Sequence, residues 1–271
     1  MTHDLLAFVG GGNMASAIIG GLVAAGRPGR SILVIDPGEA QRAKLAAEHG
    51  VRTQAAADAA LAQAAMIVWA VKPQLFQAAA APCAEHVRGA LQFSVMAGIR
   101  SEAIVRATGS QRVVRSMPNT PALIGQGIAG LYARDAVSAD ERRAAEALLA
   151  PTGRTLWVAR EEDLDAVTAL SGSGPAYVFY FVEAMMQAAL EMGLSAEQGK
   201  QLALATFAGA TALAQASSEA PEVLRERVTS KGGTTYAALT AMEASGMKAA
   251  FVEAIRAAQQ RAKELGDEFG A

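Results

Sequence analysis

The chain has 271 residues, of which 52% are hydrophobic and 18% charged, and its formal net charge at pH 7 is −2. This composition excludes an intrinsically disordered chain, which would be poor in apolar residues and rich in charge. The near-neutral charge excludes the broad basic surface typical of nucleic-acid-binding proteins. No apolar stretch approaches the roughly 18 residues that a membrane helix needs. We therefore expect no nucleic-acid partner and no membrane partner.

Signals for metals and disulfides are weak. Cys83 is the one cysteine of the sequence, so the chain has neither an internal disulfide nor a Cys-x-x-Cys pair. The three histidines are scattered along the sequence, which argues against a zinc site. With no secretory signal peptide recognised, the expectation is a cytoplasmic protein without a metal.

The first half of the sequence alternates short β-rich runs with alanine-rich helical patterns. Predicted strands are residues 5–9, 32–35, a short one near Val51, 66–71, 91–96, 112–117, 125–132 and 155–158. Predicted helices among them include residues 14–25, 39–48 and 139–149. Strand and helix in alternation predict the α/β class, here a Rossmann-type doubly wound parallel sheet covered on both faces.

After about residue 163 the strand signals vanish. Helical patterns cover residues 176–192, 196–216, 221–228, 236–245 and 247–265. We therefore predict a dinucleotide-binding domain over residues 1–162 and an all-helical C-terminal domain over residues 163–271. The helical part is heavily apolar for its length, which predicts that a second subunit covers some of its surface and that this domain forms a homodimer.

A glycine-rich turn follows the first predicted strand. The sequence Gly-Gly-Gly-Asn-Met-Ala fits the pattern G-x-G-x-x-G/A, whose first glycine makes the tight turn and whose second lets the backbone approach a pyrophosphate. Its place between a strand and a helix strengthens the prediction, because the helix N-terminus offers free N–H groups to a phosphate. The alternative is a plain turn without a ligand. The predicted cofactor-binding residues here are Gly10, Gly12, Asn13, Met14 and Ala15.

Asp36 ends the second predicted strand, 21 residues after Ala15. An acidic residue at this position binds the ribose hydroxyls of NAD and repels the additional phosphate of NADP. Alternatively, Asp36 and Pro37 cap the following helix. Arg42 could reach a 2′-phosphate if the loop bends outward, so the sequence leaves NAD(H) and NADP(H) open.

Further candidates follow the later strands, where the carboxyl ends of a doubly wound sheet face the cofactor. These additional predicted cofactor-binding residues are Val71, Lys72, Pro73, Ala97, Gly98 and Asn119. Lys72 is suited to a phosphate, ribose or carboxamide, although it could equally be a solvated surface residue. The small Ala97–Gly98 pair would let the backbone pack close to a flat ring, unless it is an ordinary turn.

Six motifs stand out along the chain: VGGGNMA (9–15), AVKP (70–73), MAG (96–98), SMPNTP (116–121), LSGSGPAY (170–177) and VTSKGGTT (228–235). In their order and spacing they resemble the motifs of pyrroline-5-carboxylate reductase, the last enzyme of proline biosynthesis. The resemblance covers essentially the whole chain, and the last two motifs are the most specific. It implies reduction of the cyclic imine 1-pyrroline-5-carboxylate to L-proline with NADPH or NADH, by homodimers that can assemble into a decamer.

The resemblance also assigns residues to the substrate. It implies a pocket built by Ser230, Gly232, Gly233, Thr234 and Thr235. The N–H groups of Gly233 and Thr234 would bind the substrate carboxylate, and the Thr235 hydroxyl would meet the ring nitrogen as the catalytic group. The alternative for the GGTT segment is a loop followed by a threonine N-cap, and one feature can serve both purposes.

The sequence departs from the family pattern at two positions. Many members have proline where Lys231 stands, and this lysine either adds positive charge near an anionic substrate or points to solvent. Members often carry an asparagine that touches the adenosine ribose before the fourth strand, and here Ala57 stands there beside Asp58.

The reaction chemistry suits these residues. A ketone reductase needs a general acid, whereas an imine can arrive already protonated as an iminium. Such a site mainly has to align the imine carbon with the nicotinamide, and a neutral hydroxyl such as Thr235 can orient the N–H group.

The segment 171–175 (SGSGP) allows two interpretations, a small-residue loop beside the nicotinamide or a helix start capped by Ser173. Two other functions compete. A β-hydroxyacid dehydrogenase would need a lysine shortly after this segment, which is absent. A non-catalytic NAD(P)-binding sensor would have no use for an imino-acid pocket.

Overall fold

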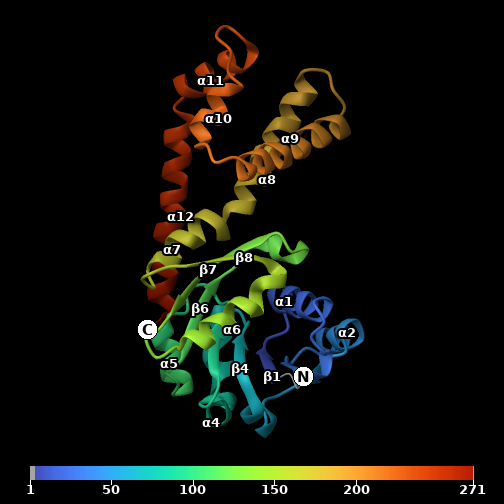
Figure 1. Cartoon of the computed structure of the whole chain (residues 1–271), viewed down its shortest axis with the longest axis vertical. Coiled ribbons are helices and arrows are strands. Elements are labelled where there is room, and N and C mark those ends of the chain that lie inside the picture. The colour runs from blue at the N-terminus through green and yellow to red at the C-terminus, as the bar shows by residue number, and fades with distance from the viewer. Residues whose placement is uncertain (1–3, 271) are drawn as a thin grey trace. The chain divides into compact units, whose positions relative to one another are not determined.

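The computed structural model describes residues 4–270. Its contacts divide the chain into a sheet unit, Met1–Ser173 with Ala258–Ala271, and a helical unit, Gly174–Ala257. The division falls after Ser173, further along the chain than the boundary at residue 162 expected from the sequence, and the end of the last helix belongs with the sheet (Figure 1).

Within residues 4–270 the sheet unit contains one eight-stranded sheet with the strand order β3-β2-β1-β4-β5-β6-β7-β8. Its strands are β1 (Leu5–Val9), β2 (Ile32–Ile35), β3 (Arg52–Gln54), β4 (Ala64–Trp69), β5 (Leu91–Ser94), β6 (Val113–Met117), β7 (Gly127–Ala133) and β8 (Gly153–Trp157). Neighbouring strands from β3 to β6 pair in parallel. The order reverses between β1 and β4, which is the switch point where doubly wound sheets bind ligands.

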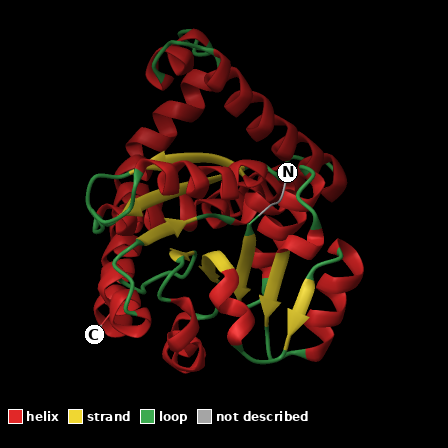
Figure 2. Cartoon of the chain, turned by 60° about the horizontal axis from the view of Figure 1, so that its bottom comes forward, coloured by secondary structure: helices red, strands yellow, loops and turns green. Residues whose placement is uncertain are grey.

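Helices cover both faces of this sheet (Figure 2). They are α1 (Asn13–Ala24), α2 (Glu39–His49), α3 (Phe76–Ala80), α4 (Ala84–Val87), α5 (Ser101–Thr108) and α6 (Ala139–Leu149). Short 3₁₀ turns are η1 (Gly29–Ser31), η2 (Ala59–Gln63), η3 (Pro73–Leu75), η4 (Ala81–Cys83), η5 (Thr120–Ile124) and η6 (Ala150–Thr152). One core cluster packs α1, α2 and α6 on one face, and a second packs α3, α4 and α5 on the other.

The sequence explains these layers directly. β2 reads Ile-Leu-Val-Ile and is buried throughout, as a strand covered on both faces should be. On α1 the buried residues Ala15, Ile18, Ile19 and Leu22 recur at helical spacing and so share one face. Each large aliphatic side chain buried in this way contributes about 1.5–3 kcal/mol.

The all-parallel sheet predicted from the sequence is correct only up to β6. β7 pairs antiparallel with β6, and β8 then runs parallel to β7. The short segment 118–126 between β6 and β7 explains the reversal, because a parallel crossover needs about a dozen residues or more. β7 and β8, by contrast, are joined through α6.

The segment that begins at Asp163 is helical well before the predicted start. α7 (Asp163–Val167) runs into a π-helical turn, η7 (Thr168–Gly172), in which the Ser173 N–H donates to the Thr168 carbonyl at 2.8 Å. Ser173 has helical backbone angles, so the prediction that it caps a new helix is wrong, and the segment is not a loop. Pro175, which has no N–H, disturbs the regular hydrogen-bond ladder at this point.

The helical unit contains α8 (Gly174–Glu191), α9 (Ala196–Ala216), α10 (Pro221–Arg227), α11 (Thr234–Ala244) and the first part of α12 (Met247–Gly270). α8 and α9 pack closely against each other. A Cβ atom added to Gly199 of α9 would lie only 2.8 Å from the Ala189 Cβ of α8, so glycine permits this close approach. Phe251 of α12 packs edge-on against Tyr177 and Phe181 of α8.

Large apolar side chains are exposed on this unit. Six of them are more than half exposed: Phe179, Tyr180, Met192, Leu202, Leu213 and Val228. An apolar surface of this kind is typical of an interface with another protein chain.

Candidate active site

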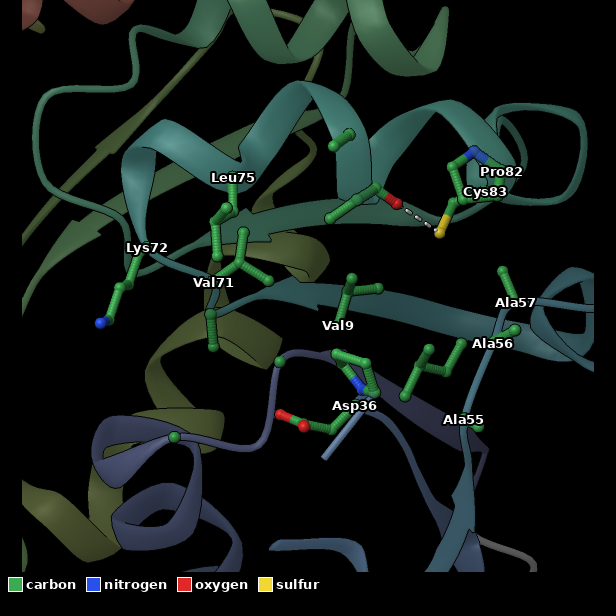
Figure 3. Close-up of a pocket in the computed structure, with 17 residues that line it drawn as sticks. Val9, Asp36, Ala55, Ala56, Ala57, Val71, Lys72, Leu75, Pro82 and Cys83 are labelled. Atoms are coloured by element: carbon green, nitrogen blue, oxygen red, sulfur yellow. Dashed lines mark hydrogen bonds between the residues drawn. The ribbon is translucent and has the colours of Figure 1, made fainter. Parts of the chain in front are cut away.

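A cavity of about 580 Å³ lies at the carboxyl ends of β1, β2 and β4, within the sheet unit (Figure 3). Its volume falls in the general range of small-molecule and cofactor sites, roughly 300–1,000 Å³. Five of the predicted cofactor residues line it, namely Gly10, Gly12, Asp36, Val71 and Lys72. The other seven do not: Asn13, Met14, Ala15, Pro73, Ala97, Gly98 and Asn119.

The three glycines of the turn after β1 differ in what a side chain at each position would contact. Gly10 has a φ of +97°, and a Cβ atom there would lie 2.6 Å from the Ala70 carbonyl oxygen. Gly11 is constrained by Leu45, whose Cδ1 would lie 2.9 Å from an added Cβ. A Cβ on Gly12, however, would meet no protein atom within 4 Å, although this residue faces the cavity. The fold itself therefore does not require glycine at position 12, whereas a ligand in contact with the backbone would.

The N-terminus of α1 begins beside this turn. Gly12 is the N-cap and supplies no capping side chain, and the first turn has no acidic residue. The N–H groups of Asn13 and Met14 therefore have no partner within the helix and suit an anion. Ala15 is 1% exposed and packs in the core, so its small size serves the contact between helix and sheet.

The Asp36 carboxylate is held by two backbone donors. Its Oδ2 accepts the Gly11 N–H and its Oδ1 accepts the Gly38 N–H, both at 2.8 Å. The N-cap of α2 is Gly38, which has no side chain to cap the helix, and the N–H that Asp36 binds is that of Gly38 itself, so Asp36 does not cap an N–H inside α2. Asp36 thus ties the glycine turn to the end of β2.

Lys72 is the one positively charged residue among the described residues that line the cavity, and Asp36 is the one negatively charged residue. Lys72 is exposed at the start of η3, after β4. β1 lies between β2 and β4, so the strands that carry the two charges are two strand spacings apart, about 10 Å.

Sequence reasoning missed the apolar wall of the cavity. Leu75, Ala78, Ala79 and Pro82 line it and recur at the spacing i, i+3, i+4, i+7, a helical stripe that could have been found in the sequence. The opposite wall is Ala55, Ala56 and Ala57, directly after β3. Ala57, which stands where the family resemblance leads us to expect an asparagine, therefore lies at the cavity.

Cys83 ends the apolar wall. Its thiol donates to the Ala79 carbonyl at 3.1 Å, as the dashed line in Figure 3 marks. Burial raises the pKa of this thiol to about 11. Cys83 is therefore a protonated, apolar surface at neutral pH and not a nucleophile.

Gly98 has a structural role inside the sheet unit. Its φ is +74°, and a Cβ atom there would lie 3.2 Å from the Leu265 carbonyl oxygen of α12. The end of α12 thus packs against the turn after β5. This contact accounts for the glycine, so a flat ring is not needed to explain it. Ala97 and Gly98 are both partly buried.

Asn119 is nearly buried and joins two backbone segments. Its Nδ2 donates to the Ser171 carbonyl at 3.1 Å, and its Oδ1 accepts the Ile128 N–H at 3.0 Å. Its amide therefore connects the π-helical turn to β7. Gly172 in that turn approaches the end of β6, since an added Cβ would lie 2.6 Å from the Met117 Cε.

A buried ionic cluster anchors α7 on the sheet. Glu161 accepts bonds from Arg115 Nη1 at 2.7 Å and from the N–H and hydroxyl of Ser101 at 2.6 and 2.5 Å. Asp165 accepts two bonds from Arg100, at 3.1 and 2.8 Å. Burial alone would raise the pKa of Glu161, but the Arg115 charge and the Ser101 hydrogen bonds outweigh burial and lower it.

The predicted substrate residues form a tight turn in the helical unit. The Gly233 N–H donates to the Ser230 carbonyl at 3.0 Å, and Gly232 has a φ of +77°. Gly233 is the N-cap of α11, so the expected threonine cap is wrong, and Thr234 and Thr235 are the first two helical residues. Lys231 is exposed in this turn.

This geometry changes which N–H groups are available at the turn. The Gly233 N–H is already used within the turn, whereas the N–H groups of Thr234 and Thr235 have no acceptor within the helix. Thr235 is partly buried, whereas Thr234 is exposed.

Among residues 4–270, no three side chains of histidine, cysteine, aspartate or glutamate come together as metal ligands. No helix of the described part of the chain is both long enough and apolar enough to span a bilayer.

Both halves of the chain match known families. Residues 161–265 match the family described as pyrroline-5-carboxylate reductase dimerisation, and residues 5–98 match NADP oxidoreductase, coenzyme F420-dependent. The exposed apolar residues of the helical unit lie in the first of these matches, which supports oligomerisation through this region.

Full-length relatives agree with these matches. The chain is 43% identical to the pyrroline-5-carboxylate reductase of Pseudomonas aeruginosa over 100% of both chains, and 40% identical to that of Haemophilus influenzae over 98% of both. Among solved structures, a Coxiella burnetii pyrroline-5-carboxylate reductase gives a TM-score of 0.90 at 33% identity, over 97% of this chain and 99% of that one. The Plasmodium falciparum reductase with NADP bound gives 0.86 at 26% identity, over 98% and 99%. The chain therefore belongs to the pyrroline-5-carboxylate reductase family.

Proposed function

We propose that this protein reduces 1-pyrroline-5-carboxylate to L-proline with NADH or NADPH. Family membership over the entire chain is the observation that carries the proposal. The cavity at the switch point of the sheet supports it, because it is the place where doubly wound folds bind a dinucleotide.

The residues present fit such a cofactor. Gly12 leaves open space over its backbone where a side chain would otherwise stand, and the α1 N-terminus beside it suits a pyrophosphate. The apolar stripe from Leu75 to Pro82 suits the face of an adenine ring. When bound, the reduced nicotinamide supplies the hydride. The chain's own residues then have to hold and orient both reactants.

The turn of residues 230–235 would hold the substrate. Its carboxylate would accept the N–H groups of Thr234 and Thr235, where the α11 N-terminus adds a favourable field. The Gly233 N–H stays in the turn, so Gly233 contributes shape, and Ser230 contributes the carbonyl that fixes it. In this proposal Gly232 provides the left-handed backbone conformation that the turn requires.

The Thr235 hydroxyl would then orient the ring N–H group. A protonated imine is already electrophilic, and hydride addition at carbon neutralises the nitrogen, so no proton has to be delivered in that step. The hydroxyl oxygen would accept a hydrogen bond from the iminium N–H, and because the hydroxyl is neutral it would leave the positive charge of the iminium in place. The gain in rate comes chiefly from alignment of the imine carbon, the kind of effect that oriented binding provides.

The proposal includes the quaternary structure and the compartment. Dimers would form through the helical unit and could assemble further into a decamer, as the family resemblance implies. The buried free thiol of Cys83 supports a reducing compartment such as the cytoplasm. Light scattering after size-exclusion chromatography measures the assembly.

A steady-state assay tests the proposed reaction. Oxidation of NADH or NADPH is followed at 340 nm after addition of pyrroline-5-carboxylate, with 3-hydroxyisobutyrate plus NAD⁺ or NADP⁺ as the test for a dehydrogenase. We expect turnover only with the cyclic imine. Turnover of the hydroxyacid would favour the dehydrogenase, and nucleotide binding without turnover would favour a sensor.

A further inference from the structure

We propose that Asp36 makes this reductase selective for NADH over NADPH. The inference rests on the proposed function for the identity of the ligand, and it adds which of the two nucleotides the cavity accepts. Asp36 lines the cavity at the end of β2, where the adenosine ribose of a dinucleotide lies in this type of fold (Figure 3).

The Asp36 carboxylate is fixed in place. The Gly11 N–H donates to its Oδ2 and the Gly38 N–H to its Oδ1, each at 2.8 Å. A carboxylate has about four acceptor positions, so positions remain for the two hydroxyls of a ribose. The two backbone donors also prevent the side chain from rotating away, because doing so would leave both N–H groups without their acceptor.

Arg42 does not offset this negative charge at the cavity. Its Nη1 donates to the backbone carbonyls of Asp36 and Pro37, both at 2.8 Å. Arg42 is partly buried and does not line the cavity. Arg42 could reach a 2′-phosphate only if the loop after β2 bent outward. Its two hydrogen bonds instead hold that loop against Arg42.

The remaining walls near Asp36 supply no cation. Pro37 and the residues directly after β3, Ala55, Ala56 and Ala57, are uncharged. Lys72 follows β4, two strands away from the strand that carries Asp36. A 2′-phosphate would therefore meet a fixed carboxylate, while the nearby Arg42 is bonded through Nη1 to the Asp36 and Pro37 carbonyls and does not line the cavity. Such like-charge contacts strongly disfavour binding.

Calorimetry on the wild-type enzyme without substrate tests the selectivity separately from catalysis. The probes are NADH and NADPH, together with 5′-AMP and adenosine 2′,5′-bisphosphate, which differ only in the 2′-phosphate. We expect each ligand that carries the 2′-phosphate to bind at least about tenfold more weakly than its partner. Equal or tighter binding of the 2′-phosphorylated ligands to the wild type overturns the proposal.

Two variants assign the selectivity to Asp36. Asp36→Ser removes the carboxylate and should reduce the NADH-to-NADPH affinity ratio by about tenfold. Glu39→Gln is the matched control, because Glu39 is exposed in the first turn of α2 and outside the cavity, and its loss changes the net charge equally. If the NADH-to-NADPH affinity ratio of Asp36→Ser equals the ratio measured for Glu39→Gln, the proposal is also overturned. If Asp36→Ser fails to fold, Asp36→Asn replaces it, and the wild-type measurement still decides.

Failure of the proposed function gives a different result. Selective nucleotide binding without turnover of pyrroline-5-carboxylate by either nucleotide would remove the reductase assignment and leave the role of Asp36 intact. Turnover of pyrroline-5-carboxylate with tighter binding of NADPH than of NADH would support the reductase assignment and remove the proposed role of Asp36.

Discussion

The side chain of Asn119 donates to the carbonyl of Ser171 at 3.1 Å, so that a residue just after β6 holds a π-helical turn far along the chain. The same amide accepts the Ile128 N–H. The sequence suggested Asn119 as a cofactor contact, whereas its amide oxygen and nitrogen are both engaged with backbone. Asn119 is thus a candidate positioning residue for the SGSGP segment.

We expect Asn119→Ala to lower the free energy of unfolding by about 1–3 kcal/mol, because it leaves the partly buried Ile128 N–H without an acceptor. Asn119→Asp keeps that acceptor but places an oxygen against the Ser171 carbonyl. The Asn119→Asp variant should therefore lose less stability than Asn119→Ala, because the Ile128 N–H keeps its acceptor. It should still displace the π-helical turn, because two oxygens then face each other. Urea unfolding and kcat/KM measure the two effects, and unchanged values for both variants would remove Asn119 from this role.

Gly12 and Gly10 allow a matched comparison of ligand contact with fold. Gly12→Ala adds a Cβ that meets no protein atom, so stability should fall by no more than about 1 kcal/mol, the cost of alanine at the α1 N-cap, while NADH affinity falls. Gly10→Ala places a Cβ 2.6 Å from a carbonyl oxygen at a φ of +97° and should lower the melting temperature. Thermal unfolding and calorimetry with NADH are the measurements. Undiminished NADH binding by Gly12→Ala would contradict the nucleotide site.

Thr235→Ala should reduce kcat with pyrroline-5-carboxylate by about tenfold to a hundredfold, the scale of one oriented hydrogen bond. α11 should persist, because its N-cap is Gly233 and not a threonine. Thr235→Ser keeps the hydroxyl and should recover most of the rate. Circular dichroism checks the fold of both variants, and full activity of Thr235→Ala would exclude the hydroxyl from the mechanism.

The lowered pKa of Glu161 should make the stability of the protein decrease at acidic pH. The Glu161 pKa is lowered in the folded state, so its contribution is present above the ordinary carboxyl pKa of 4.5 and is lost as the pH falls through the lowered value. Glu161→Gln leaves the Arg115 charge buried without its partner and should cost about 3–5 kcal/mol at pH 7.

Below about pH 4 the difference between wild type and Glu161→Gln should shrink. Urea unfolding from pH 7 to pH 3 measures it. Glu162→Gln, one residue along and exposed, serves as the control and should change little at any pH. A difference that is constant across this range would refute the assigned ionisation.

Much of the sheet unit can be predicted from local pattern. Buried strands such as β2 are continuous apolar runs, and the glycine turn, Asp36 and Lys72 lie at the ends of three strands that are neighbours in the sheet, β1, β2 and β4. The antiparallel direction of β7 was missed, although the predicted strands 112–117 and 125–132 leave only residues 118–124 between them, too few for a parallel crossover. The Asn119–Ser171 bond was not predicted either, because it joins residues far apart in sequence and leaves no local signal.

The N-terminus of α11 shows a different limit. The residues of the GGTT segment were identified, but which N–H groups it offers depends on the bond from Gly233 to Ser230, a detail of turn geometry. A motif indicates residue types, whereas hydrogen bonding inside the turn decides which of them remain available to a ligand.

Transfer of an isotopic label tests the central claim most directly. The enzyme is incubated with pyrroline-5-carboxylate and NADH or NADPH in which both hydrogens at the nicotinamide C4 are deuterium, and the product is examined by mass spectrometry and NMR. We predict L-proline with one deuterium at C5, the former imine carbon. Formation of no proline, or of proline without deuterium at C5, would contradict the account.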